Sequence, residues 1–195
     1  MSETTALTRY KSQYVAKKAL FSFLGSSFRL FDSNGNLVFF IKQKAFKLKE
    51  EITVFADEAM KEPQLRIKAR SIMDVSATYD VTDANSGEVV GAMQRKGLRS
   101  LIRDEWAILD TEEVEIGKVI EDSGALALLR RFIKLIPQTF HVKIGDTQIG
   151  EIKQRFNPFI LAYDVDFTAD TNSDVDPRLA VAAVVLLLAI EGRQK

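Results

Sequence analysis

The chain has 195 residues and a mass of 21.9 kDa, and its 27 Lys and Arg residues are balanced by 27 Asp and Glu residues. Hydrophobic residues make up 46% and charged residues 28%, which excludes a disordered or collagen-like chain. The zero net charge argues against a general nucleic-acid-binding protein. The absence of cysteine excludes disulfides, thiolate metal sites and cysteine nucleophiles, and the single histidine, His141, excludes a site with several histidine ligands.

The composition along the chain predicts one domain after a short tail. Residues 1–12 are polar and lack the apolar run that a signal peptide needs, so we expect a flexible tail there. No linker rich in Ser, Gly or Pro divides the rest, which predicts a single domain over residues 13–195. The lack of cysteine fits a cytoplasmic protein.

Short strands separated by turn signals are predicted from Tyr14 to Phe167. Turns at 32–36, 83–87 and 145–146 contain the Asn, Asp and Gly residues that tight hairpins require. Many short strands favour a barrel or a sandwich over alternating βα units. The twelve predicted strands are residues 14–19, 28–31, 37–41, 52–55, 65–70, 77–82, 89–94, 105–109, 116–121, 140–144, 148–153 and 162–167.

An internal repeat follows the three hairpin turns. Similar ten-residue segments occupy 35–44, 87–96 and 146–155, with starting points 52 and then 59 residues apart. Because the spacing is unequal, the repeat indicates a recurring hairpin unit rather than a solenoid of fixed period.

Two segments break the strand pattern and predict helices. Residues 123–137 carry apolar side chains at helical spacing with Arg and Lys between them, which predicts a short amphipathic helix. Residues 179–190 contain only Leu, Ala, Val and Ile, after Asp176 as N-cap and Pro177 at the first helical position. Twelve helical residues span roughly 18 Å, too short for a bilayer core of about 30 Å. We therefore expect the second helix to be buried in protein rather than in lipid.

Five motifs in order carry a resemblance to a known family. They are Phe-Arg-Leu-Phe-Asp-Ser-Asn-Gly at 28–35, Gly-Ala-Met-Gln-Arg-Lys-Gly at 91–97, Asp-Glu-Trp at 104–106, Glu-Asp-Ser at 121–123 followed by Leu-Leu-Arg-Arg at 128–131, and the apolar C-terminal helix. With these motifs the chain, from about Tyr14 to its end, resembles the LURP-one-related family, which belongs with phospholipid scramblases and Tubby C-terminal domains in one superfamily. The resemblance implies a Tubby C-terminal-like domain, a closed twelve-stranded antiparallel β-barrel that encloses a hydrophobic C-terminal α-helix.

Cationic residues near the ends of the three repeats form the candidate binding site. The repeat alignment places five cations at equivalent positions: Lys42 and Lys44 in the first repeat, Lys96 in the second, and Lys153 and Arg155 in the third. Because side chains alternate along a strand, Lys42 and Lys44 face the same side. If the repeats lie near one another, these residues form a positive stripe that can hold the phosphates of an anionic lipid. Tubby domains, which the chain resembles distantly, bind phosphatidylinositol bisphosphate. The alternative is that these are ordinary solvated charges on the outside of a barrel.

Other polar clusters predict no metal site, no cofactor and no catalytic site. The acidic stretch 164–176 places oxygen ligands at alternate positions, but Val175 and Val181 stand where a calcium loop needs Gly and a bidentate Glu. The cationic run 95–103 lacks interleaved aromatic residues, so no nucleic-acid partner is predicted, and Trp106 is expected in the core. No catalytic motif is present, and His141 is expected to be structural.

We therefore expect a monomeric, non-enzymatic binding module in the cytoplasm that meets anionic phospholipid headgroups at a membrane surface without being integral to the membrane. The main alternative is a protein-interaction scaffold with no small-molecule ligand. An enzyme acting on phosphorylated or lipid substrates ranks third. A scramblase ranks fourth, because the apolar helix is short and the acidic stretch departs from a calcium pattern.

Overall fold

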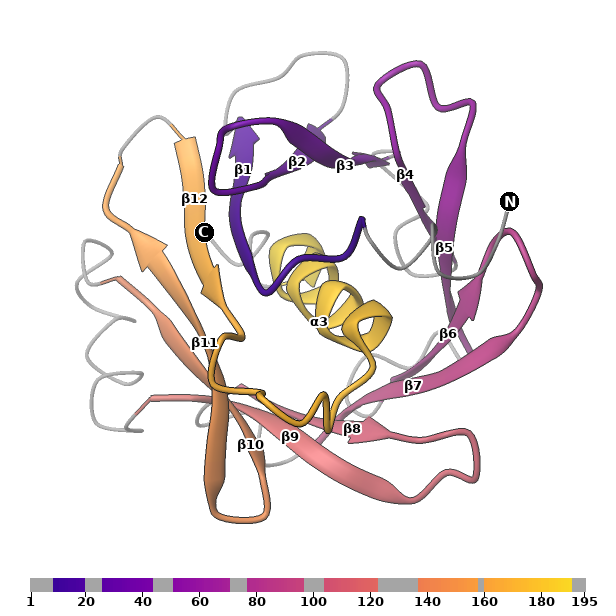
Figure 1. Cartoon of the computed structure of the whole chain (residues 1–195), viewed down its shortest axis with the longest axis vertical. Helices are drawn as coiled ribbons and strands as arrows, with labels where there is room; N and C mark the ends of the chain where they lie inside the picture. Colours follow the sequence, from indigo (N-terminus) through magenta and orange to yellow (C-terminus); the bar gives the residue numbers. More distant parts are fainter. Residues whose placement is uncertain are drawn as a thin grey trace.

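The computed structural model describes residues 9–19, 26–43, 51–70, 77–96, 104–122, 137–157 and 160–190. Within these residues, twelve antiparallel strands close into a barrel around one helix, α3 (Pro177–Ile190) (Figure 1). The strands are β1 (Gln13–Ala19), β2 (Ser26–Phe31), β3 (Leu37–Gln43), β4 (Glu51–Phe55), β5 (Pro63–Ala69), β6 (Thr78–Asp83), β7 (Val89–Arg95), β8 (Glu105–Leu109), β9 (Glu115–Glu121), β10 (Thr139–Ile144), β11 (Thr147–Arg155) and β12 (Ile160–Asp166).

The predicted architecture is confirmed. Each of the twelve predicted strands is present, with its ends moved by at most two residues. Each strand pairs with its sequence neighbours, and β1 pairs with β12, so the sheet closes and leaves no edge strand. The amphipathic helix predicted over 123–137 lies outside the described residues, apart from Pro137.

Helix α3 fills the barrel, and its start is built as the sequence predicts. The Asp176 carboxylate accepts a hydrogen bond from the Arg178 backbone N–H at 2.8 Å, and the Asp176 carbonyl accepts one from the Leu179 N–H at 2.9 Å. Every residue from Leu179 to Ala189 is buried. In the described part of the chain, no helix has both the length and the apolar character needed to cross a membrane.

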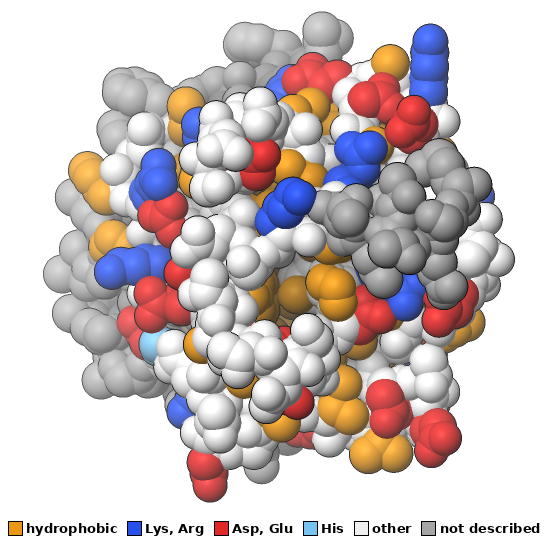
Figure 2. Space-filling model, viewed as in Figure 1, with side chains coloured by type: hydrophobic (Ala, Val, Ile, Leu, Met, Phe, Trp, Pro, Cys, Tyr) orange, Lys and Arg blue, Asp and Glu red, His pale blue; other side chains and the backbone are white. Residues whose placement is uncertain are grey.

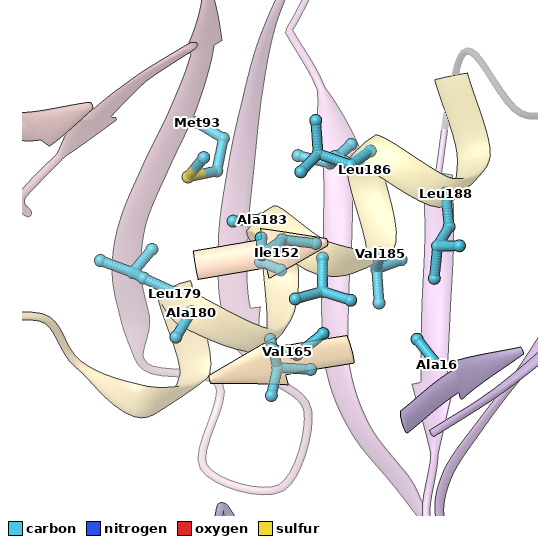
Figure 3. Packing of buried hydrophobic residues seen from close by; sticks show 14 of the residues in the cluster. Ala16, Met93, Ile152, Val165, Leu179, Ala180, Ala183, Val185, Leu186 and Leu188 are labelled. Atoms are coloured by element: carbon cyan, nitrogen blue, oxygen red, sulfur yellow. The ribbon is translucent and has the colours of Figure 1, made fainter. Parts of the chain in front are cut away.

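The strands pack closely around this helix. Figure 3 shows the helix side chains, Leu179 among them, near strand residues such as Met93 and Val165. At Gly91 of β7 the fit is tightest, since an added Cβ would lie 2.3 Å from the Leu109 carbonyl oxygen and 3.2 Å from Cδ1 of Leu179. Gly91 also has a φ of +145°, which a residue with a side chain rarely adopts. The glycine therefore sets how closely β7 approaches both β8 and α3.

The two ends of the barrel differ. At the entry end, where α3 begins, the β2–β3, β4–β5, β6–β7, β8–β9 and β10–β11 connections and the 167–176 segment are all described. In Figure 1, the 167–176 segment runs beside the start of α3 at this end, and residues 9–12 also pass near the helix. At the exit end, where α3 finishes, the odd-numbered strands end and the even-numbered strands begin.

The three repeated hairpins, β2–β3, β6–β7 and β10–β11, are spread evenly around the barrel. Their second strands, β3, β7 and β11, are each four strands apart in the ring of twelve described strands. The repeats are therefore about a third of the circumference apart, and all three second strands end at the exit end.

Candidate functional site

The predicted cations that the structure describes lie in the exit half of the barrel, on or directly after strands β3, β7 and β11. Lys42 is an exposed residue of β3, Lys153 and Arg155 are exposed residues of β11, and Lys96 follows β7 directly. Lys44 lies outside the described residues. Because β3, β7 and β11 are four strands apart, the repeats do not lie near one another as a single continuous stripe requires.

Lys42, Lys153 and Arg155 nevertheless lie on one side of the barrel. Two further cations, which the sequence analysis did not single out, lie on the same side. Strands β12, β1 and β2 separate β11 from β3, and their outer faces add Lys17 and Arg29. Arg155, Lys17 and Arg29 lie along one register row, in which Lys17 and Arg29 are directly opposite. Lys42 lies two residues from this row toward the exit end, and Lys153 lies two residues toward the entry end. We call these five residues the basic band.

Two members of the basic band are neutralised by carboxylates. Arg155 donates from Nε and Nη2 to the Asp164 carboxylate at 2.8 and 2.5 Å, and Arg29 donates to Glu58 at 2.7 and 3.1 Å. The hydrogen bonds that Arg155 donates to Asp164 raise the pKa of Arg155, and those that Glu58 accepts from Arg29 lower the pKa of Glu58. Both pairs are solvent-exposed, so each contributes less than about 1 kcal/mol and can exchange for another anion.

Among the described residues, none forms an ion pair with the three lysines of the basic band, although Lys153 is the register partner of Asp164. Lys17, Lys42 and Lys153 are exposed, and none has a carboxylate within 4.0 Å among the described residues. Lys17 lies over the Phe31 ring, with its Nζ 5.0 Å from the ring centroid. Like charges placed directly opposite on neighbouring strands, as Lys17 and Arg29 are, destabilise a sheet. The band is thus a local positive surface on a chain whose net charge is zero.

Lys96 and Arg95 do not belong to the basic band. The Lys96 Nζ lies 2.7 Å from a Glu115 carboxylate oxygen. Arg95 is largely buried and forms an ion pair with Asp104 at 3.0 Å. Trp106, predicted to be a core residue, is 1% exposed, which confirms the prediction.

A polar network at the exit end was also missed by sequence reasoning. Glu121 is buried, and its carboxylate accepts hydrogen bonds from the Asp104 backbone N–H at 3.2 Å and from the Gln138 amide at 3.3 Å. The Tyr163 hydroxyl donates to the same Gln138 side chain at 3.4 Å. These groups satisfy one another's hydrogen bonds, so the network is accounted for by structure alone.

A surface hollow of about 370 Å³ lies over β9 and β10 and is lined by Lys118, His141 and Lys143, among others. Lys118 and Lys143 are register partners, and His141 Nδ1 lies 3.9 Å from a Glu151 oxygen. Its described lining contains no serine, threonine or tyrosine that could act as a nucleophile.

The acidic stretch serves local structure. Asp164 binds Arg155, Asp170 accepts hydrogen bonds from the Asp174 and Val175 backbone N–H groups, and Asp176 caps α3. In the described parts of the chain, no three His, Asp or Glu side chains are grouped so as to hold a metal ion.

The described connections at the entry end carry more acidic than basic residues, and two arginines outside these connections pair with carboxylates there: Arg9 with Glu62, and Arg178 with Asp83, Glu88 and Asp176. In these six described connections, Lys61 is the one basic residue. Figure 2 looks onto this end and shows acidic side chains, together with Lys and Arg side chains, around a central hollow with hydrophobic side chains. The acidic residues of these connections are Asp32, Asp57, Glu58, Glu62, Glu88, Asp110, Glu112, Glu113, Asp146, Asp170, Asp174 and Asp176.

The fold defines the class of protein: a closed antiparallel β-barrel filled by its own C-terminal helix. The family model of the LURP-one-related proteins matches residues 38–188, and the chain belongs to this family. The X-ray structure of the Arabidopsis thaliana protein AT5G01750 is similar to the chain, with a TM-score of 0.51 and 14% sequence identity, covering 95% of this chain and 96% of that one. This similarity shows the shared fold. No curated protein matches the chain.

Proposed function

We propose that the chain is a non-catalytic binding module whose basic band docks onto anionic phospholipid headgroups, phosphoinositides included, at a cytoplasmic membrane surface. The observation that carries the proposal is the set of three exposed lysines, Lys17, Lys42 and Lys153, which lie on one side of the barrel and form no ion pair with a described residue. Lysine ammonium groups bind phosphate oxygens, and each cation near an anionic leaflet contributes about 1 kcal/mol. Arg29 and Arg155 add guanidinium groups whose present carboxylate partners are solvent-exposed.

The size of the effect can be worked out from these lysines. Three exposed lysines contribute about 3 kcal/mol of attraction, which corresponds to roughly a hundredfold in partitioning. Because such charges are screened over about 8 Å at physiological ionic strength, binding must weaken as salt is added. The proposal thus predicts reversible, salt-sensitive association rather than permanent anchoring.

The test is vesicle flotation with a charge-matched control. The protein is floated with phosphatidylcholine vesicles, alone and with added phosphatidylserine or phosphatidylinositol bisphosphate. The band variant carries Lys17→Glu, Lys42→Glu and Lys153→Glu. The control carries Lys61→Glu, Lys118→Glu and Lys143→Glu, which make the same change in net charge on lysines outside the band.

We expect the unmodified chain and the control to float with the anionic vesicles only, and the band variant to lose at least about a hundredfold in partitioning, because each Lys→Glu change adds repulsion to the lost attraction. Equal loss in both variants would show that net charge, and not the band, drives binding. If the unmodified chain floats with none of these vesicles, the docking proposal is wrong. The scaffold alternative, a surface that recruits a protein partner, then becomes the better hypothesis.

A further inference from the structure

Two lysines lie opposite each other in the surface hollow over β9 and β10. Lys118 of β9 and Lys143 of β10 are direct register partners, and both line the hollow. Neither forms an ion pair with a described residue. Like charges directly opposite on neighbouring strands destabilise a sheet, so this pair is unfavourable unless an anion lies between the two ammonium groups.

Three carboxylates also line the hollow, but none forms an ion pair with either lysine. Glu121 is buried, and its side chain accepts hydrogen bonds from the Asp104 backbone N–H and the Gln138 amide. Asp122 follows the exit end of β9, and Asp146 lies in the turn between β10 and β11. The carboxylates thus stand at the two ends of the hollow, and the two lysines stand between them.

His141 adds a further donor to the same part of the hollow. It lies two residues before Lys143 on β10, so the two side chains are on the same face of the sheet. Its Nδ1 is buried without a hydrogen bond to a described residue, and a Glu151 carboxylate oxygen is 3.9 Å from it. A protonated imidazole has a second N–H, at Nε2, which can donate to an anion in the hollow.

The size and lining of the hollow define the class of ligand. Its volume of about 370 Å³ falls in the range of small-molecule sites and exceeds what a bare phosphate group needs. Ile120, the register partner of His141, also lines the hollow and offers apolar surface beside the cations. A phosphate ester matches both features, since its phosphate accepts hydrogen bonds from two ammonium groups and its carbon skeleton can contact Ile120.

From this arrangement we propose that the hollow binds a small soluble phosphate monoester. The phosphate lies between Lys118 and Lys143, with His141 as a third donor, and the organic part lies against Ile120. The inference goes beyond the proposed docking to membranes, because the basic band lies on β11, β1, β2 and β3 and shares no residue with the hollow.

His141 is the single histidine of the chain, so its NMR signals report on the hollow directly. The full chain is titrated with sodium phosphate, with glycerol 3-phosphate, and with sodium chloride at matched ionic strength. The hollow variant carries Lys118→Gln and Lys143→Gln. The matched control carries Lys17→Gln and Lys42→Gln, which make the same change in net charge on exposed lysines of the basic band.

We expect both phosphates to shift the His141 signals in a saturable way, the ester at lower concentration, and chloride to leave the signals unchanged. The hollow variant is expected to bind glycerol 3-phosphate at least about tenfold more weakly, because two charge-assisted contacts are lost, whereas the control keeps its affinity. The emission of buried Trp106 reports whether each variant is folded.

An equal response to chloride, or an equal loss in the two variants, overturns the site. An ester that binds no more tightly than inorganic phosphate overturns the contribution of Ile120. Vesicle flotation separates a soluble ligand from a lipid headgroup: we expect the hollow variant to float as the unmodified chain does, and a loss of flotation as large as that of the band variant overturns the soluble ligand. If the unmodified chain does not float but responds to phosphate as expected, the docking proposal alone is wrong.

Discussion

Replacing Arg178 with methionine tests how the barrel holds the start of its central helix. The Arg178 side chain is 13% exposed and donates to Asp176 at 2.8 Å, to Glu88 at 2.8 Å and to Asp83 at 3.4 Å. It thereby ties the first turn of α3 to the β6–β7 hairpin. Methionine keeps most of the apolar stem but removes the charge and the hydrogen bonds.

The expected loss in the free energy of unfolding depends on how deeply each carboxylate partner of Arg178 is buried. Hydrogen bonds to charged groups contribute about 1.5–3 kcal/mol, but the half-exposed Glu88 contributes at most about 1 kcal/mol because water screens it. Asp83 is 13% exposed and loses its cation, which is the costliest part of the change. Together these terms predict a loss of about 3 kcal/mol in the free energy of unfolding.

The assay is urea denaturation followed by the fluorescence of Trp106, the single tryptophan, which is 1% exposed. The control is Arg155→Met, whose bidentate partner Asp164 is 46% exposed, so its loss is expected to stay below about 1 kcal/mol. Equal losses in the two variants, or a loss below about 1 kcal/mol for Arg178→Met, would refute the reasoning that burial sets the strength of the Arg178 cluster.

The same variant has a defined pH dependence. Burial raises the pKa of Asp83, but hydrogen bonds from the Ser86 and Asn85 backbone and from Arg178 outweigh it and lower the pKa below its ordinary value of 3.8. A lowered pKa contributes stability that is present above pH 3.8 and is lost as the pH falls through the lower folded-state value. The difference in stability between the unmodified chain and Arg178→Met should therefore be constant from neutral pH down toward pH 5 and shrink as the pH falls below about 4.

Three further predictions concern packing and surface charge, and urea denaturation measures each. Leu186→Ala, at a fully buried position of α3, should lower the free energy of unfolding by about 3 kcal/mol; a loss below about 1 kcal/mol would mean that the helix is not part of the core. Gly91→Ala should cost about 3 kcal/mol or more through its clash with a backbone oxygen, whereas Gly87→Ala, with open space around it, should cost about 1 kcal/mol. Lys143→Glu should raise stability by about 0.5 kcal/mol, because it places a carboxylate opposite Lys118; a decrease would contradict the register.

The sequence alone predicts every local element of the described fold. Alternating apolar residues and turn residues predicted the twelve strands, and Asp176 with Pro177 predicted the start of α3. These features depend on a few neighbouring residues, through backbone torsion angles and side-chain periodicity, so they can be found without knowing what packs against them. The closed barrel came from the resemblance to a family, since periodicity alone left barrel and sandwich open.

The membership of the basic band was decided only by the tertiary structure. The repeat alignment suggested that Lys96 shares a surface with Lys42 and Lys153, but even spacing of the repeats puts β7 on another part of the barrel. Lys17 and Arg29 belong to no motif, and they join the band because β1 pairs with β12 when the barrel closes. That closure joins residues 153 positions apart, such as Gln13 and Asp166, and no local pattern of residues can encode which distant strands become neighbours.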